Sequence, residues 1–123
     1  MLGQASIIAF APSTDLERSR AFYEGVLGLT VEDLNGFALV LRVGSTMLRV
    51  TRVESLNPQP FTVLGWAVEG IEGVIDGLVS RGVTFHRYDG MPQDDRGIWT
   101  APGGGRIAWF SDPDANVLSL TAF

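Results

Sequence analysis

The chain has 123 residues, and its 9 Lys and Arg residues against 14 Asp and Glu residues give a formal net charge of −5. A nucleic-acid binder depends on a basic face that neutralises phosphates, so this acidic composition argues against a nucleic-acid partner. The chain has no cysteine and a single histidine, His86, which excludes disulfides, thiolate nucleophiles and a metal site built on two histidines of one chain.

No targeting or membrane segment is evident. The first ten residues lack the basic start and the apolar length of a signal peptide. The longest apolar runs are far shorter than the ~18 residues that a membrane-spanning helix needs. We therefore expect a cytoplasmic protein with no membrane partner.

The first half of the sequence predicts a strand, a helix and three further strands. Pro12 ends the first apolar run, Asp15 and its neighbours can cap a helix, and Asn35-Gly36 is a strong hairpin signal between two extended runs. The predicted ranges are a strand at 6–11, a helix at 16–27 and strands at 30–34, 37–43 and 46–53.

After a linker at residues 54–60, which holds two prolines and has no periodicity, the same order of elements begins again. The predicted ranges are a strand at 61–68, a helix at 71–81 and strands at 83–88, 98–101, 106–111 and 117–122. Residues 103–105 are interpreted as a hairpin turn. Residues 112–116 are interpreted as a turn in which Asp and Asn side chains bind their own backbone, rather than as a calcium loop. A strand, a helix and a run of strands thus occur twice, which we interpret as a repeated βαβββ unit, although the second copy has one more predicted strand than the first.

Three segments resemble the vicinal oxygen chelate superfamily, which includes glyoxalase I, extradiol dioxygenases and bleomycin-resistance proteins. They read TDLERSRAFYEGVLGL at 14–29, WAVEGIE at 66–72 and FSDPDANVLSL at 110–120, the last similar to the family pattern F-x-D-P-D-G-N-x-I-E-L. The resemblance implies an α+β fold in which two tandem βαβββ modules form curved mixed sheets around a cavity, with the helices outside. It implies one domain over 1–123, with module one at about 1–53 and module two at about 61–123, and a homodimer.

Enzymes of this superfamily usually hold one divalent metal through four side chains on the first and last strands of the modules. The resemblance places these four positions at Ile8, Arg49, Val63 and Ser119. Two of these side chains have no donor atom, one is a fixed cation, and a neutral serine is a poor ligand for a hard cation. We therefore expect no metal and no other cofactor.

The favoured hypothesis is a glyoxalase- or bleomycin-resistance-like protein that binds a small organic molecule in its cavity. An apolar wall with a few polar groups is typical of ligand pockets. The predicted ligand-binding residues are Ile8, Phe10, Arg49, Thr51, Val63, Ser119 and Thr121.

Arg49 has two interpretations. It either binds an anionic ligand or forms an internal salt bridge with Glu32 or Asp33. Most other aromatic residues, Trp109 among them, are expected in the core.

The alternative hypothesis is an enzyme of the same superfamily, of lyase, isomerase or dioxygenase type. It is either metal-dependent or uses acid–base catalysis by His86 together with a nearby carboxylate. Strand alternation places His86 on the same face as Thr84 and Tyr88. A third hypothesis is a protein-interaction module with a filled cavity.

Overall fold

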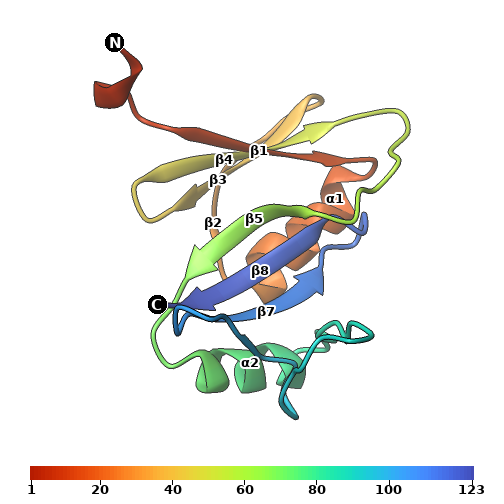
Figure 1. Ribbon diagram of the computed structural model, residues 1–123. Helices are drawn as coiled ribbons and strands as arrows, with labels where there is room; N and C mark the ends of the chain where they lie inside the picture. Colours follow the sequence, from red (N-terminus) through yellow and green to blue (C-terminus); the bar gives the residue numbers. More distant parts are fainter. The chain divides into compact units, whose positions relative to one another are not determined.

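The computed structural model describes all residues from 1 to 123 (Figure 1). The chain divides into two compact units, Met1–Pro58 and Gln59–Phe123. Each unit contains one four-stranded mixed sheet that is curved and open, together with helical segments. The α+β fold class predicted from the sequence is confirmed.

The first unit has the sheet order β1-β4-β3-β2, in which β1 runs parallel to β4 and the other neighbours are antiparallel. β1 continues through Pro12, where the sequence predicted its end. Because β1 is an edge strand, the missing N–H of a proline can face the free edge without breaking the ladder. The elements are η1 (Leu2–Gln4), β1 (Ile8–Ser13), α1 (Leu16–Arg20), its π-helical continuation η2 (Ala21–Val26), β2 (Thr30–Leu34), β3 (Ala38–Val43) and β4 (Thr46–Arg52).

Local side-chain hydrogen bonds explain the ends of these elements. The Asp15 carboxylate accepts a hydrogen bond of 3.0 Å from the backbone N–H of Arg18 and so caps α1. The Asn35 side-chain oxygen accepts from the N–H groups of Phe37 and Ala38, at 2.8 and 3.0 Å, and closes the predicted hairpin. α1 packs on β3 and β4.

The second unit has the sheet order β5-β8-β7-β6, and Figure 1 shows β5, β8 and β7 side by side with α2 beside the sheet. α2 contacts β8, and its residues Ile71, Ile75 and Leu78 are buried. Phe110 and Leu118, which are paired on neighbouring strands, are also fully buried. The elements are β5 (Thr62–Ala67), α2 (Ile71–Ser80), β6 (Trp99–Thr100), β7 (Arg106–Ser111) and β8 (Val117–Ala122).

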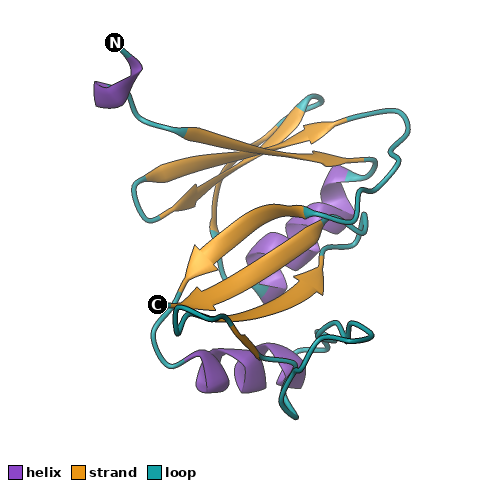
Figure 2. Cartoon of the chain, viewed as in Figure 1, coloured by secondary structure: helices purple, strands orange, loops and turns teal.

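The strand predicted at 83–88 does not form, and Figure 2 shows the segment between α2 and β6 as loop. One backbone hydrogen bond, from the N–H of His86 to the carbonyl of Trp109 at 2.8 Å, ties it to β7. The amide of Gln93 satisfies the next backbone groups instead of a strand: it accepts from the N–H of Tyr88 at 2.7 Å and donates to the carbonyl of His86 at 2.9 Å. A side chain therefore replaces the missing ladder partner.

The turn predicted at 112–116 is confirmed. One carboxylate oxygen of Asp112 accepts from the N–H groups of Asp114 and Asn116, both at 2.9 Å, and the other accepts from the Asn116 side chain. None of the helices has both the length and the apolar character needed to cross a membrane.

Candidate ligand-binding site

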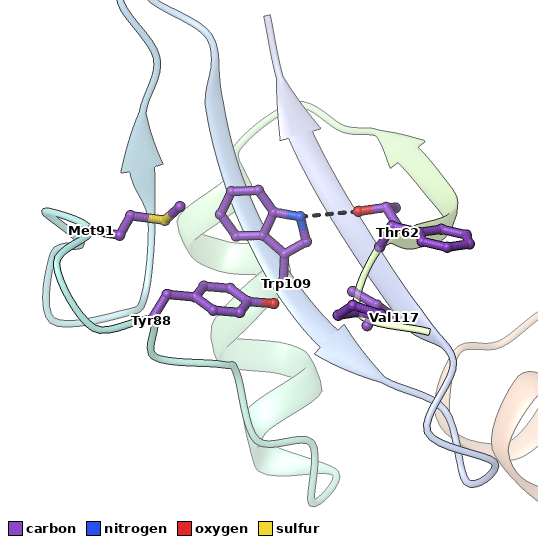
Figure 3. Close-up of a pocket in the computed structure, with 7 residues that line it drawn as sticks. Thr62, Tyr88, Met91, Trp109 and Val117 are labelled. Atoms are coloured by element: carbon purple, nitrogen blue, oxygen red, sulfur yellow. Dashed lines mark hydrogen bonds between the residues drawn. The ribbon is translucent and has the colours of Figure 1, made fainter. Parts of the chain in front are cut away.

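The second unit contains an open pocket of about 370 Å³ on the side of the sheet that carries Trp109 (Figure 3). The start of β5 and the segment before it, the loop after α2, and strands β7 and β8 all contribute to it. The lining residues are Pro60, Phe61, Thr62, Tyr88, Met91, Trp109 and Val117.

Trp109 forms the centre of this pocket and is held in a fixed orientation. Its indole N–H donates to the hydroxyl oxygen of Thr62 at 3.2 Å, which is drawn in Figure 3. Its ring lies edge-to-face with the ring of Tyr88, at 5.6 Å between centroids, and tilted against Trp99 at 6.3 Å. These contacts define the position of the largest apolar surface in the pocket.

A β-bulge determines which residue of β5 reaches Trp109. Thr62 pairs with Val117 and Leu64 pairs with Leu118, so the register shifts at Val63. As a result Thr62, and not Val63, bonds to the indole. Thr62 was not among the predicted site residues, and a bulge leaves no signal in a single sequence.

Two hydroxyl groups flank His86 beside the pocket. The Nε2 atom of His86 lies 2.8 Å from the Ser111 hydroxyl oxygen, and its Nδ1 atom lies 3.0 Å from the Tyr88 hydroxyl oxygen. Partial burial lowers the pKa of His86 and raises the pKa of Tyr88. Both groups are thus neutral at pH 7.

The structure gives His86 two hydroxyl partners, Tyr88 and Ser111, and no carboxylate is hydrogen-bonded to its ring. His86 and Tyr88 are in contact, although the strand that was predicted to place them on one face does not form. The expectation that Trp109 belongs to the core is wrong, since it is only partly buried and lines the pocket.

The other predicted residues of the second unit lie on strand β8. Ser119 is 7% exposed and pairs with Gly65 on one side and Trp109 on the other. A Cβ atom at Gly65 would lie 2.7 Å from the Ser119 hydroxyl oxygen, so glycine leaves room for that side chain. Thr121 pairs with Ala67 and is partly exposed.

The predicted residues of the first unit lie on one face of two paired strands. Phe10 on β1 pairs with Arg49 on β4. Ile8 and Thr51 follow two residues away along their own strands, on the same face. Ile8 and Phe10 are 48% and 58% exposed.

The salt bridge considered for Arg49 does not form. Glu32 pairs with Arg42 at 2.8 Å, and the Asp33 carboxylate accepts a hydrogen bond of 2.9 Å from the Asn35 side chain. Arg49 therefore keeps its guanidinium group free of these two acids.

The residues at the family's metal positions do not fit a metal ion. In the first unit the pair is Ile8 and Arg49, and in the second unit it is Val63 and Ser119, which together offer one neutral hydroxyl. A hard divalent cation prefers several carboxylate or carbonyl oxygens. No group of three or more His, Cys, Asp or Glu side chains that could hold a metal is present among residues 1–123.

The sequence matches the Glyoxalase/Bleomycin resistance protein/Dioxygenase superfamily over residues 7–120, which is nearly the whole chain. The chain belongs to this superfamily. The resemblance seen in the sequence is thereby confirmed. No curated protein matches the sequence significantly.

Solved structures of the superfamily share the fold. A member from Sphaerobacter thermophilus is 22% identical, with a TM-score of 0.76 and full coverage of both chains. A glyoxalase family protein from Enterococcus faecalis is 24% identical, with a TM-score of 0.71 and coverage of 98% of this chain and 99% of that one. A lactoylglutathione lyase from Agrobacterium tumefaciens is 15% identical, with a TM-score of 0.74 and coverage of 97% and 93%.

Proposed function

We propose that this superfamily member binds a small, flat aromatic molecule and does so without a metal ion. The observation that carries the proposal is the pocket around Trp109, where aromatic and thioether side chains surround a space of about 370 Å³. Ligand pockets of roughly 300–1,000 Å³ are typically apolar with a few placed polar groups. A volume at the low end of that range suits a ligand of one or two rings.

The orientation of the aromatic side chains supports the choice of a flat ligand. Tyr88 stands edge-on to Trp109, and Met91 lines the same pocket (Figure 3). Aromatic rings favour stacked or edge-to-face neighbours, and a thioether contacts ring edges favourably. An aromatic ligand can use all three contacts at once.

Isothermal titration with 2-acetylnaphthalene tests this function. The Trp109→Leu variant should bind this probe at least about tenfold more weakly, as expected when a central aromatic contact is lost. Phe37→Ala is the matched control, because Phe37 is 81% exposed and belongs to the first unit. Circular dichroism verifies that both variants fold. Equal affinity of Trp109→Leu and the unmodified protein would contradict the proposed site.

We also propose that the face of the first unit around Arg49 binds an anionic group. The support is the guanidinium group of Arg49, which is not paired with Glu32 because Glu32 already pairs with Arg42. Arg49→Met should weaken binding of 2-naphthoate about tenfold, which is the effect of one hydrogen bond to a charged group. The control is Arg42→Met, which removes an exposed arginine that is already paired. Unchanged affinity in Arg49→Met would remove Arg49 from the site.

A further inference from the structure

Ser111, His86 and Tyr88 form a continuous hydrogen-bonded row that ends in the pocket. The distances are 2.8 Å from Ser111 Oγ to His86 Nε2 and 3.0 Å from His86 Nδ1 to Tyr88 Oη. Of the three residues, only Tyr88 lines the pocket. The row therefore joins a serine on β7 to the one hydroxyl of the pocket that is not already engaged by Trp109.

The backbone around this row is fixed. The N–H of His86 donates to the carbonyl of Trp109 at 2.8 Å. The side-chain amide of Gln93 bonds to the backbone of His86, Tyr88 and Gly97, at 2.9, 2.7 and 2.8 Å. The row is thus preorganised, which lowers the conformational entropy lost when a ligand binds.

The row carries one more proton than its two hydrogen bonds use, so one hydroxyl proton is always available to donate to another group. A neutral imidazole carries one N–H, and each hydroxyl carries one O–H, so three protons serve two hydrogen bonds. If Ser111 donates to Nε2, the Nδ1–H donates to Tyr88, and the proton of Tyr88 remains available in the pocket. If Tyr88 donates to Nδ1, the proton of Ser111 is the one left over.

The greater exposure of Tyr88 favours one of these two arrangements. A hydroxyl proton without an acceptor is costly where water is excluded. Tyr88 is 36% exposed at the pocket, whereas Ser111 is only partly exposed on strand β7. The free proton is therefore better placed on Tyr88, with His86 in the Nδ1–H tautomer.

Building on the proposed function, we propose that Tyr88 selects aromatic ligands that carry a hydrogen-bond acceptor, namely aryl carbonyl compounds. Its hydroxyl donates to the carbonyl oxygen, while the Ser111–His86 pair holds the phenolic oxygen as an acceptor from Nδ1–H. Tyr88 touches the ligand and is a specificity-determining residue. His86 and Ser111 act through it and are positioning residues.

A matched pair of probes tests whether Tyr88 selects aromatic ligands that carry a carbonyl group. 2-Acetylnaphthalene and 2-isopropenylnaphthalene have nearly the same shape and differ by a carbonyl oxygen against a CH₂ group. We expect the unmodified protein to bind the ketone about fivefold more tightly, which is the effect of one neutral hydrogen bond. Tyr88→Phe should weaken binding of the ketone alone, so that the two probes bind with equal affinity. Ser111→Ala should reduce the ratio, and the exposed Ser80→Ala at the end of α2 should leave it unchanged.

The lone histidine gives a second, independent readout. Because His86 is the only histidine, ¹⁵N-histidine labelling yields the resonances of this one imidazole and reports its tautomer directly. The Nδ1–H tautomer in the ketone complex supports the inference, and the Nε2–H tautomer overturns it. Equal affinity for the two probes overturns the inference alone. Binding of neither probe overturns the proposed function and the inference with it.

Discussion

His86 is half-buried, and this position makes the stability of the protein depend on pH near neutrality. Partial burial penalises the charged imidazolium and lowers the pKa of His86 below its ordinary value of about 6.5. Below that value the unfolded chain binds a proton that the folded chain does not yet bind. Stability is therefore complete above about pH 6.5 and falls as the pH drops toward the pKa of the folded state.

Thermal unfolding between pH 7.5 and 5.5 measures this effect. The melting temperature should fall across the window, and His86→Gln, which cannot titrate, should flatten the profile. Glu72 and Asp76 do not interfere, because their hydrogen bonds to Arg106 and Arg96 hold the pKa of each carboxyl below its usual value. A profile that stays steep in His86→Gln would assign the dependence to another group.

Among the elements, the turn between β7 and β8 contains a residue whose conformation favours glycine. Ala115 has a φ of 66°, in the left-handed region, where the similar family pattern D-P-D-G-N has glycine. This conformation costs a residue with a Cβ atom roughly 1–2 kcal/mol. Glycine also raises the entropy of the unfolded chain, so Ala115→Gly should stabilise the protein by only about 0.5–1 kcal/mol.

Chemical denaturation checks this prediction against a control of opposite sign. Ala21 is exposed and has helical dihedral angles, φ −57° and ψ −34°. Ala21→Gly should therefore destabilise the protein by about 1 kcal/mol. If both glycine variants were destabilising, relief of strain at Ala115 would be too small to matter.

The strands of the second unit show which parts of the fold could be predicted from the sequence and which could not. β7 and β8 have the predicted bounds, because glycines at 103–105 and the Asp112 turn mark their ends. The segment 83–88 has strand-like alternation, yet its backbone bonds to the side chain of Gln93 in the following loop, a replacement that periodicity cannot show. The site was harder to predict because the bulge at Val63 and the exposure of Trp109 depend on how strands pair.

For the whole molecule, exposed apolar surface on the first unit leads us to predict a homodimer. Ile7, just before β1, is 76% exposed, and Ile8 and Phe10 on β1 are 48% and 58% exposed. β1 is an edge strand, and apolar side chains clustered at such a position commonly mark an interaction site. A second copy of the chain would remove this surface from water.

Native mass spectrometry of the untreated protein tests the dimer and the metal-free site in one measurement. We expect twice the chain mass with no divalent metal, because Ile8, Arg49, Val63 and Ser119 provide too few donor atoms. Phe10→Glu should shift the spectrum toward monomer, since a dimer would have to bury the new carboxylate without a partner. Phe37→Glu, on a residue that is 81% exposed in the β2–β3 turn, should leave the dimer intact. A monomeric unmodified protein would contradict the dimer, and a stoichiometric metal on each chain would contradict the argument from the donor atoms.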